Sequence, residues 1–296
     1  MARLFDAYVI VDWSAASKPV TGPDSIWIGV LKRDVRFRLA FSAQNPSTRA
    51  EAAASLTQLL ADFARRGERC LVGFDFPLGF PRGVGAALKL AAPHWRANID
   101  FVSRDIKDKA DNTNNRFQVA AKMNRLMTGA PFPFWGCPAR EEQTTLKAKR
   151  QRDHAADDLP ELRMCEAAAP GVSPIWKLYY QGSVGGQALT GLPVIKKLKD
   201  AAGDKIKLWP FETGWRALSA SDLEGVDAVF AEVWPSLLGT KPAAGQAKDE
   251  AQVHALAAHL AALDEQNKLA ALFGPKAGAK ASAEIVEGEE GWILGI

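Results

Sequence analysis

Cysteine is scarce in this chain, and no two cysteines are closely spaced. The 296 residues include Cys70, Cys137 and Cys165, and none of them belongs to a CxxC motif. Zinc sites and disulfide frameworks need closely spaced or paired cysteines, so the sequence indicates neither. A sparse and odd number of cysteines is typical of proteins from a reducing cytoplasm.

Long apolar runs and a dominant sign of charge are also missing. No stretch reaches the roughly 18 apolar residues that a membrane-spanning helix needs, and the N-terminal MARLFDAYVIVDWS lacks a signal-peptide pattern. We therefore expect a soluble, cytoplasmic protein with no membrane partner. The 37 basic and 34 acidic residues give a net charge of +3, which is too even a balance to indicate nucleic-acid binding by itself.

The first third of the chain has the pattern of a mixed sheet. Four short apolar or alternating runs predict strands, over residues 7–13, 25–31, 35–42 and 70–76. The first three have only turns between them and predict an antiparallel meander. A helix capped at Ser47 or Thr48 and ended by Gly67 separates the third run from the fourth. Such a crossover predicts that the fourth strand lies parallel to the first.

The rest of the chain completes an α/β fold with helices on both faces of the sheet. Strand patterns resume at 206–211 and 228–233, and an apolar-periodic helix begins at Asp249. Residues 84–200 break this rhythm, with helical patterns near 106–126 and 140–158. We expect one domain over residues 1–296, in which 84–200 form a large helical and loop insertion over the active-site crevice.

Acidic residues stand at the ends of three strand-like runs. They are Asp12 in VIVDWS, Asp75 in LVGFDFP and Glu232 in VFAEVWPS. A single aspartate at a strand end is more often a turn residue, but an ionised group next to a buried run must be paired, bound to metal or neutralised. Because ligands bind outside the carboxyl ends of parallel strands, Asp12 and Asp75 together predict a site for Mg²⁺ or Mn²⁺.

Two further acids are candidates for the same site. Asp249 shares one helix face with Val253, Leu256 and Leu260, at spacings of four, three and four residues, which predicts that it points inward. Its alternative interpretation is a first-turn acid favoured by the helix dipole. Glu212 in LWPFETGW resembles Glu232 in its surroundings, so it is a competing or additional metal ligand.

Other features carry weaker signals. The glycine-rich segment Gly182–Gly186 has no GK[ST] motif, so a tight turn is favoured over a phosphate loop. Basic residues gather in the insertion, which is typical of a solvated helix face but leaves open a nucleic-acid or phosphoester partner. The aromatic run PFPFWGCP is expected to pack rather than to stack bases. The basic residues are Arg104, Lys107, Lys109, Arg116, Lys122, Arg125, Lys147, Lys149, Arg150 and Arg152.

Several of these motifs resemble one family. VIVDWSAA, GFDFPLGFP, AEVWPS and KDEAQVHALAAHLAA are similar to motifs of domain-of-unknown-function family 429, over about residues 5–82 and 205–265. The resemblance implies a ribonuclease H-like fold. It also implies two divalent cations held by Asp12, Asp75 and Asp249, with Glu232 as the extra acid of the family. An acid on the first helix has no counterpart, because Glu51 comes too early in that helix.

The sequence therefore supports one leading hypothesis and two alternatives. The leading one is a metal-dependent phosphodiester hydrolase, nuclease-like, that uses Asp12, Asp75, Glu232 and Asp249 with Mg²⁺ or Mn²⁺. The first alternative is a non-catalytic nucleic-acid or nucleotide-binding protein of the same fold. The second is a phosphotransferase, for which only the Gly185-Gly186 segment offers a nucleotide site.

Overall fold

A computed structural model, which describes residues 3–169 and 171–296, contains a six-stranded mixed sheet. The strand order is β3-β2-β1-β4-β6-β5, in which β1, β2 and β3 are antiparallel and β4, β6 and β5 run parallel to β1. The strands are β1 (Ala7–Asp12), β2 (Trp27–Arg33), β3 (Leu39–Gln44), β4 (Cys70–Phe74), β5 (Ile206–Leu208) and β6 (Ala228–Glu232). The expected α/β class with an antiparallel meander followed by parallel strands is confirmed.

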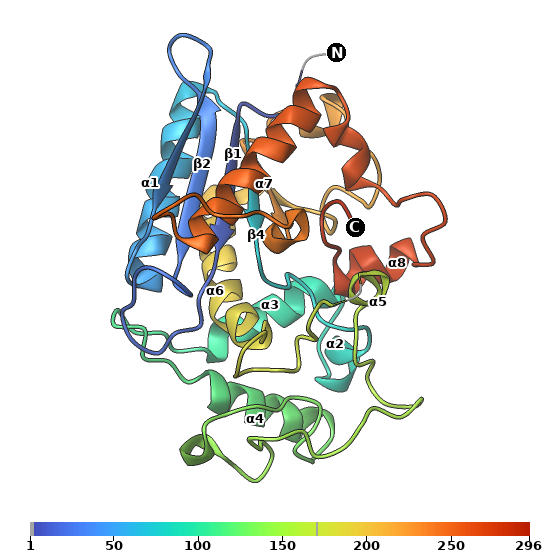
Figure 1. The fold of residues 1–296 in the computed structure, drawn as a ribbon. Coiled ribbons are helices and arrows are strands. Elements are labelled where there is room, and N and C mark those ends of the chain that lie inside the picture. The colour runs from blue at the N-terminus through green and yellow to red at the C-terminus, as the bar shows by residue number, and fades with distance from the viewer. Residues whose placement is uncertain (1–2, 170) are drawn as a thin grey trace.

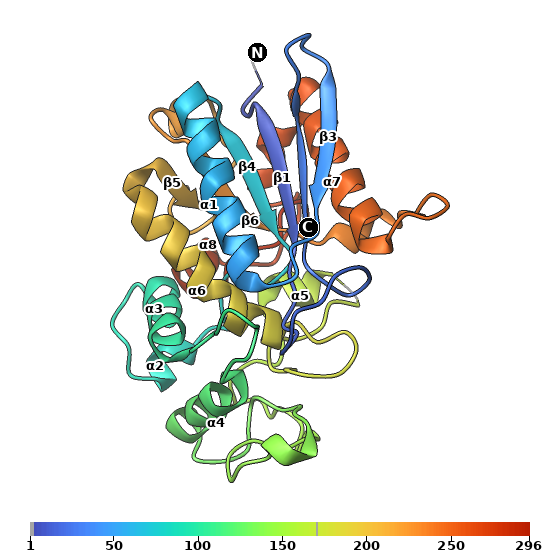
Figure 2. The ribbon, with the colours of Figure 1, turned by 90° about the vertical axis from the view of Figure 1, so that its left-hand side faces the viewer.

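Eight α-helices accompany the sheet in the described part of the chain. They are α1 (Arg49–Arg66), α2 (Val84–Ala87), α3 (His94–Asp105), α4 (Arg116–Met127), α5 (Met164–Ala168), α6 (Gly185–Ala202), α7 (Lys248–Glu265) and α8 (Ala283–Ile285). Helix α7 covers one face of the sheet, and α1 and α6 cover the other (Figures 1 and 2). None of the described helices is long and apolar enough to cross a membrane.

Strand alternation divides the core into two clusters, one on each face. Val9 and Val11 of β1 pack with side chains of α1 and α6, whereas Tyr8 and Ile10 pack with Val253 and other residues of α7. Successive side chains of a strand point to opposite faces. The face of each strand-end residue is therefore fixed by its parity along the strand.

The helix between the meander and β4 begins and ends where the sequence predicts. Thr48 accepts a hydrogen bond from the backbone N–H of Glu51 through its hydroxyl, at 3.2 Å. Gly67 ends α1 with φ 66°, in the left-handed region that favours glycine. The crossover places β4 directly beside β1 in parallel register.

Two local expectations are wrong. Residues 34–38 form the hairpin turn before β3, so Val35 and Phe37 are exposed rather than half-buried in a strand. The charged segment 140–158 is not a helix; after a short 3₁₀ turn at Ala139–Glu141 it is irregular. The charged side chains of this segment form local ion pairs, such as that of Arg152 with Asp158.

Residues 84–200 lie partly beyond one end of the sheet and partly within the core. Helices α2, α3 and α4 lie beyond the sheet end at which β1 finishes (Figures 1 and 2). Helix α6 instead adds Leu189, Leu192 and Ile195 to the core on the α1 face. The apolar face of α6 therefore helps to build the sheet core, so 84–200 is not only a cover over the crevice.

Close packing of α6 on the segment after β4 generates a stability prediction. A Cβ added at Gly191 would overlap the ring of the buried Phe76. We expect Gly191→Ala to lower the free energy of unfolding by up to about 2 kcal/mol, because overpacking costs about 1–3 kcal/mol and alanine regains roughly 1 kcal/mol of helix propensity. Urea unfolding measures this change. The exposed Lys197→Ala on the same helix is the control, and an equal loss there would contradict the packing argument.

Candidate functional site

Asp12 and Asp75 are brought together by the register of β1 and β4. Val11 pairs with Phe74 in the parallel ladder, and the backbone N–H of Asp75 donates to the Val11 carbonyl at 3.1 Å. The residues that follow this pair are Asp12 and Asp75. Their side chains therefore project toward the face of the sheet that α7 covers. The Asp75 carboxylate also accepts a hydrogen bond from the Trp13 backbone N–H at 2.7 Å.

Ionising both carboxyl groups of this pair is energetically unfavourable, because they are buried and close together. Burial raises the pKa of both groups, that of Asp75 to about 6 and that of Asp12 well above its usual range. A hydrogen bond between the two groups raises the pKa of Asp12 and lowers that of Asp75, and the charge of Asp249 contributes to the rise of both pKa values. From these shifts we expect the pair to hold one proton between its two carboxyl groups near neutral pH.

Asp249 joins the pair from the first turn of α7. Val253, Leu256 and Leu260 are buried, as predicted for this face of the helix, and Asp249 at its start is half-buried and lines the cavity described below. The Asp249 carboxylate accepts a hydrogen bond from the backbone N–H of Asp24 at 2.8 Å. Asp24, in the loop between β1 and β2, also raises the pKa of Asp12 through its charge, and the sequence patterns did not single it out.

Three of these acids line one large cavity. Asp12, Asp24 and Asp249 lie on the wall of a cavity of about 1170 Å³, together with the loop that follows β1. The cavity is also lined by Thr113 and Asn114 before α4, by Arg116 and Phe117 at its start, and by residues 178–183 and Gln187. A phosphoester-sized ligand therefore has room next to the carboxylates.

Glu232 does not join this group, because its position in the strand has the opposite parity. It pairs with Phe74 rather than with Asp75, which places its side chain on the other face. There the Glu232 carboxylate accepts hydrogen bonds from both terminal nitrogens of Arg163, at 2.6 and 2.8 Å, and one from the Leu78 N–H at 3.2 Å. Burial raises the Glu232 pKa, and the adjacent guanidinium opposes that rise.

Glu212 is also separate from the pair. Strand β5 is the sheet edge, two strands away from β4. The Glu212 carboxylate accepts a hydrogen bond from the Leu208 N–H at 2.9 Å and contacts Lys199 and Arg96, at 3.1 and 3.6 Å. Its charge is thus already balanced by two basic side chains.

The donor set of the three converging aspartates suits a hard divalent cation. Asp12, Asp75 and Asp249 offer only oxygen ligands, and none of them is paired with a basic side chain in the part of the chain that the structure describes. Within these residues no group of three or more acidic, histidine or cysteine side chains has the spacing of a formed metal site. A cation would take the place of the shared proton and draw the carboxylates around itself.

The weaker sequence signals also find their places. Gly182 has φ 72°, and Gly185 opens α6, where an added Cβ would overlap the Ile175 carbonyl; the segment is a tight turn followed by close packing, as favoured. Phe132 and Phe134 are buried, which confirms the expected packing role. Most of the basic residues are exposed or ion-paired, as a solvated face requires.

The shared proton leads to a prediction about pH. A raised carboxyl pKa stabilises the folded protein most below the ordinary value of 3.8, and this contribution is lost as the pH rises through about 6. An amide at position 75 keeps the acceptor for the Trp13 N–H and donates to Asp12. We therefore expect Asp75→Asn to raise the free energy of unfolding by about 1–3 kcal/mol at pH 8 without metal.

Urea unfolding between pH 4 and 8 in the presence of EDTA tests this expectation. The difference between variant and wild type should shrink toward pH 4, where the wild-type pair is protonated. If Asp75→Asn has the same stability as the wild type at every pH, or is less stable than the wild type at pH 8, the two groups do not share a proton.

The position of Glu232 leads to a second prediction. Glu232→Gln leaves Arg163 with a weakened partner in a buried site, so we expect a loss of about 2–5 kcal/mol in the free energy of unfolding. Asp222→Asn, which weakens an exposed ion pair with Arg216, should cost less than about 1 kcal/mol. Mn²⁺ should still stabilise the Glu232→Gln variant. If this stabilisation is lost, Glu232 is a metal ligand after all.

No protein-family model, curated protein or solved structure matches this chain. The proposal about its function therefore rests on the geometry of Asp12, Asp75 and Asp249 and on the cavity that Asp12 and Asp249 line.

Proposed function

We propose that this protein is a divalent-metal-dependent phosphodiester hydrolase with a ribonuclease H-like arrangement of its sheet. Asp12, Asp75 and Asp249 are its proposed metal ligands, with Mg²⁺ or Mn²⁺ as the cation. The observation that carries the proposal is the convergence of three carboxylates without basic partners, from β1, from the end of β4 and from α7, beside an open cavity. Glu232 and Glu212 are left out, because Arg163 and Lys199 already neutralise them.

The order of the elements supports the same proposal. An antiparallel meander, a crossover helix, a parallel strand and a late helix place acids on the first strand, the fourth strand and the C-terminal helix. This is the arrangement implied by the resemblance to domain-of-unknown-function family 429. A fold hosts many functions, so the carboxylate geometry is the stronger support.

The residues of the site have separable tasks. The Trp13 N–H fixes one oxygen of Asp75, and the Asp24 N–H fixes one oxygen of Asp249, so both carboxylates are oriented before a ligand enters. A bound divalent cation would supply charge stabilisation at the phosphoryl oxygens and acidify an attacking water. Asp12, which lines the cavity, is the residue placed to contact both the cation and the substrate.

Cleavage assays with paired variants test this function. We expect Mn²⁺-dependent hydrolysis of a phosphodiester, such as bis(p-nitrophenyl) phosphate or a single-stranded oligonucleotide, and a loss on the order of a hundredfold or more in Asp12→Asn and Asp249→Asn. Glu250→Gln, the neighbour of Asp249 on α7, should keep wild-type activity.

Thermal unfolding gives an independent readout of the metal. Mn²⁺ should raise the melting temperature of the wild type and of Glu250→Gln, because it binds the folded state alone, but not that of Asp12→Asn. Metal binding without cleavage of any phosphodiester would favour the non-catalytic alternative. Cleavage that survives in Asp12→Asn would refute the proposed site.

A further inference from the structure

A buried arginine on the cavity wall carries a further inference. Arg116, the first residue of α4, is only 4% exposed, yet it lines the same cavity as Asp12. One terminal nitrogen donates to the Ser17 hydroxyl and to the Asn114 side-chain oxygen, each at 3.0 Å. Its Nε–H finds no acceptor among the described residues.

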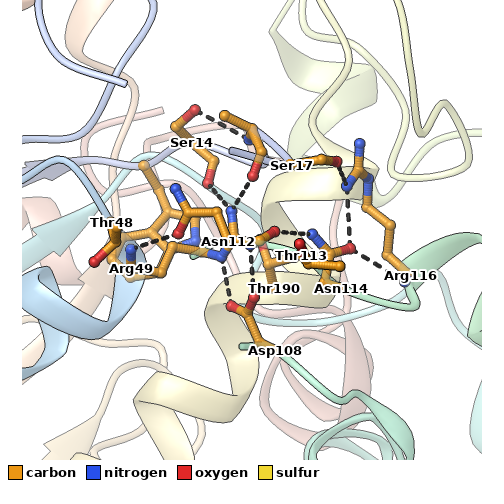
Figure 3. Close-up of polar contacts among 12 residues, drawn as sticks. Ser14, Ser17, Thr48, Arg49, Asp108, Asn112, Thr113, Asn114, Arg116 and Thr190 are labelled. Atoms are coloured by element: carbon orange, nitrogen blue, oxygen red, sulfur yellow. Dashed lines mark hydrogen bonds and ion pairs between the residues drawn. The ribbon is translucent and has the colours of Figure 1, made fainter. Parts of the chain in front are cut away.

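Arg116 also has no carboxylate partner in the described part of the chain. The nearby Asp108 is engaged by Arg49, whose Nη2 donates to it at 2.6 Å, and Figure 3 shows Arg116 on the side of Ser17 and Asn114 instead. Burial and, second to it, the charge of Arg49 lower the pKa of Arg116 to about 10, against the weaker opposing charges of Asp108 and Glu141. A buried cation without a counter-ion is costly, and an anionic ligand would remove that cost.

The N-termini of α4 and α6 also lie at this cavity. The first N–H of α4, that of Arg116, donates to the Asn114 side-chain oxygen at 3.2 Å, and the first N–H of α6, that of Gly185, donates to the Lys177 carbonyl at 3.0 Å. The N-cap residues Asn115 and Val184 make no side-chain cap, and the second residue of α4, Phe117, and the third of α6, Gln187, line the cavity. A Cβ on Gly186 would lie 3.4 Å from Arg116 Nε and 2.8 Å from the Leu178 carbonyl. The start of α6 therefore packs directly against the arginine. Helix N-termini favour anions through their free N–H groups and their dipoles.

Aromatic side chains adjoin the arginine on the cavity wall. The Arg116 guanidinium carbon lies 4.3 Å from the centroid of Phe117, which is 6.1 Å from the ring of Tyr179. Tyr179 and Tyr180 have their ring centroids 4.9 Å apart and are 39% and 51% exposed. Half-exposed tyrosines beside an unpaired arginine offer a stacking surface next to an anion site.

We infer that Arg116 binds a phosphate group of a nucleotide unit whose base packs on Tyr179 and Tyr180. This phosphate subsite belongs to the substrate of the aspartate site, and in that respect the inference rests on the proposed function. The chemistry that it recognises, phosphate joined to an aromatic base, is shared by a free nucleotide and by a single-stranded nucleic acid. Binding at Arg116 itself requires neither metal nor turnover.

Calorimetric titrations in EDTA test the subsite. The probes are adenosine 5′-monophosphate, adenosine, orthophosphate and a single-stranded hexanucleotide. We expect the monophosphate to bind wild type on the order of tenfold or more tightly than adenosine does, since a charge-assisted hydrogen bond is lost without the phosphate. Tighter binding of the hexanucleotide than of the monophosphate identifies a nucleic-acid chain as the source, and the reverse identifies a free nucleotide.

Variants locate the interaction. Arg116→Lys should weaken monophosphate binding on the order of tenfold, and Tyr180→Ala should weaken it at least several-fold through lost stacking. Arg125→Lys, an exposed arginine on the same helix, should bind like wild type. If Arg116→Lys does not fold, the Nε–H resonance of Arg116 in the wild type, identified by its position-specific loss in Arg116→Gln or by selective labelling, should shift when the monophosphate is added.

The outcomes separate this inference from the proposed function. Equal affinities for adenosine and the monophosphate, or unchanged affinity in Arg116→Lys, overturn the subsite even if the protein hydrolyses phosphodiesters. Arg116-dependent binding in Asp12→Asn, together with a wild type that never cleaves, supports the subsite and refutes the hydrolase.

Discussion

One parallel strand pairing determines where the acidic residues of the candidate site lie. The hydrogen bond from the Asp75 N–H to the Val11 carbonyl sets β4 beside β1 in a register that brings Asp12 and Asp75 to the same face. The two carboxyl groups then lie within hydrogen-bonding reach, and burial raises both of their pKa values. A shift of one residue in either strand would separate them, since side chains alternate between the faces. Helix α7 packs on that face and adds the third aspartate.

Buried arginines show how the fold handles charge outside this site. Arg163 is enclosed by the carboxylates of Glu166 and Glu232, so its cluster is neutralised from within. Arg49 is bound by Asp108 and by the carbonyls of Ser14 and Ala16, and it fixes the loop after β1. Arg116 differs because it has hydroxyl and amide partners but no carboxylate. It also lines the cavity, and the charges of Asp108 and Glu141 act on it without direct contact. These two features distinguish Arg116 from the two structural arginines.

The sequence was sufficient for those parts of the fold that depend on local patterns. Periodicity, the Thr48 cap and Gly67 predicted the meander, the crossover helix and β4, and hence the pairing of Asp12 with Asp75. The sequence predicts Glu232 at the same site because it also ends a strand, but the face on which its side chain lies depends on the register between strands, which the sequence does not contain. The burial of Arg116 could not be predicted from its sequence neighbours, since it depends on α6 and on residues 178–180, which are distant along the chain. The charge pattern of segment 140–158 predicts a helix wrongly, because a surface helix also needs an apolar face to pack on the core.

The loop after β1 links the acidic residues of the candidate site to Arg116. Its first residue, Trp13, holds Asp75 through the backbone N–H, and Ser17 accepts a hydrogen bond from Arg116. Arg49 holds the carbonyls between them (Figure 3). The spacing of the acidic end from the basic end is therefore fixed by one short, anchored segment. If the two proposals hold, the acidic residues would take the cation and Arg116 the phosphate, so the proposed ligand is a metal-bound molecule whose phosphate lies at a set distance from the metal.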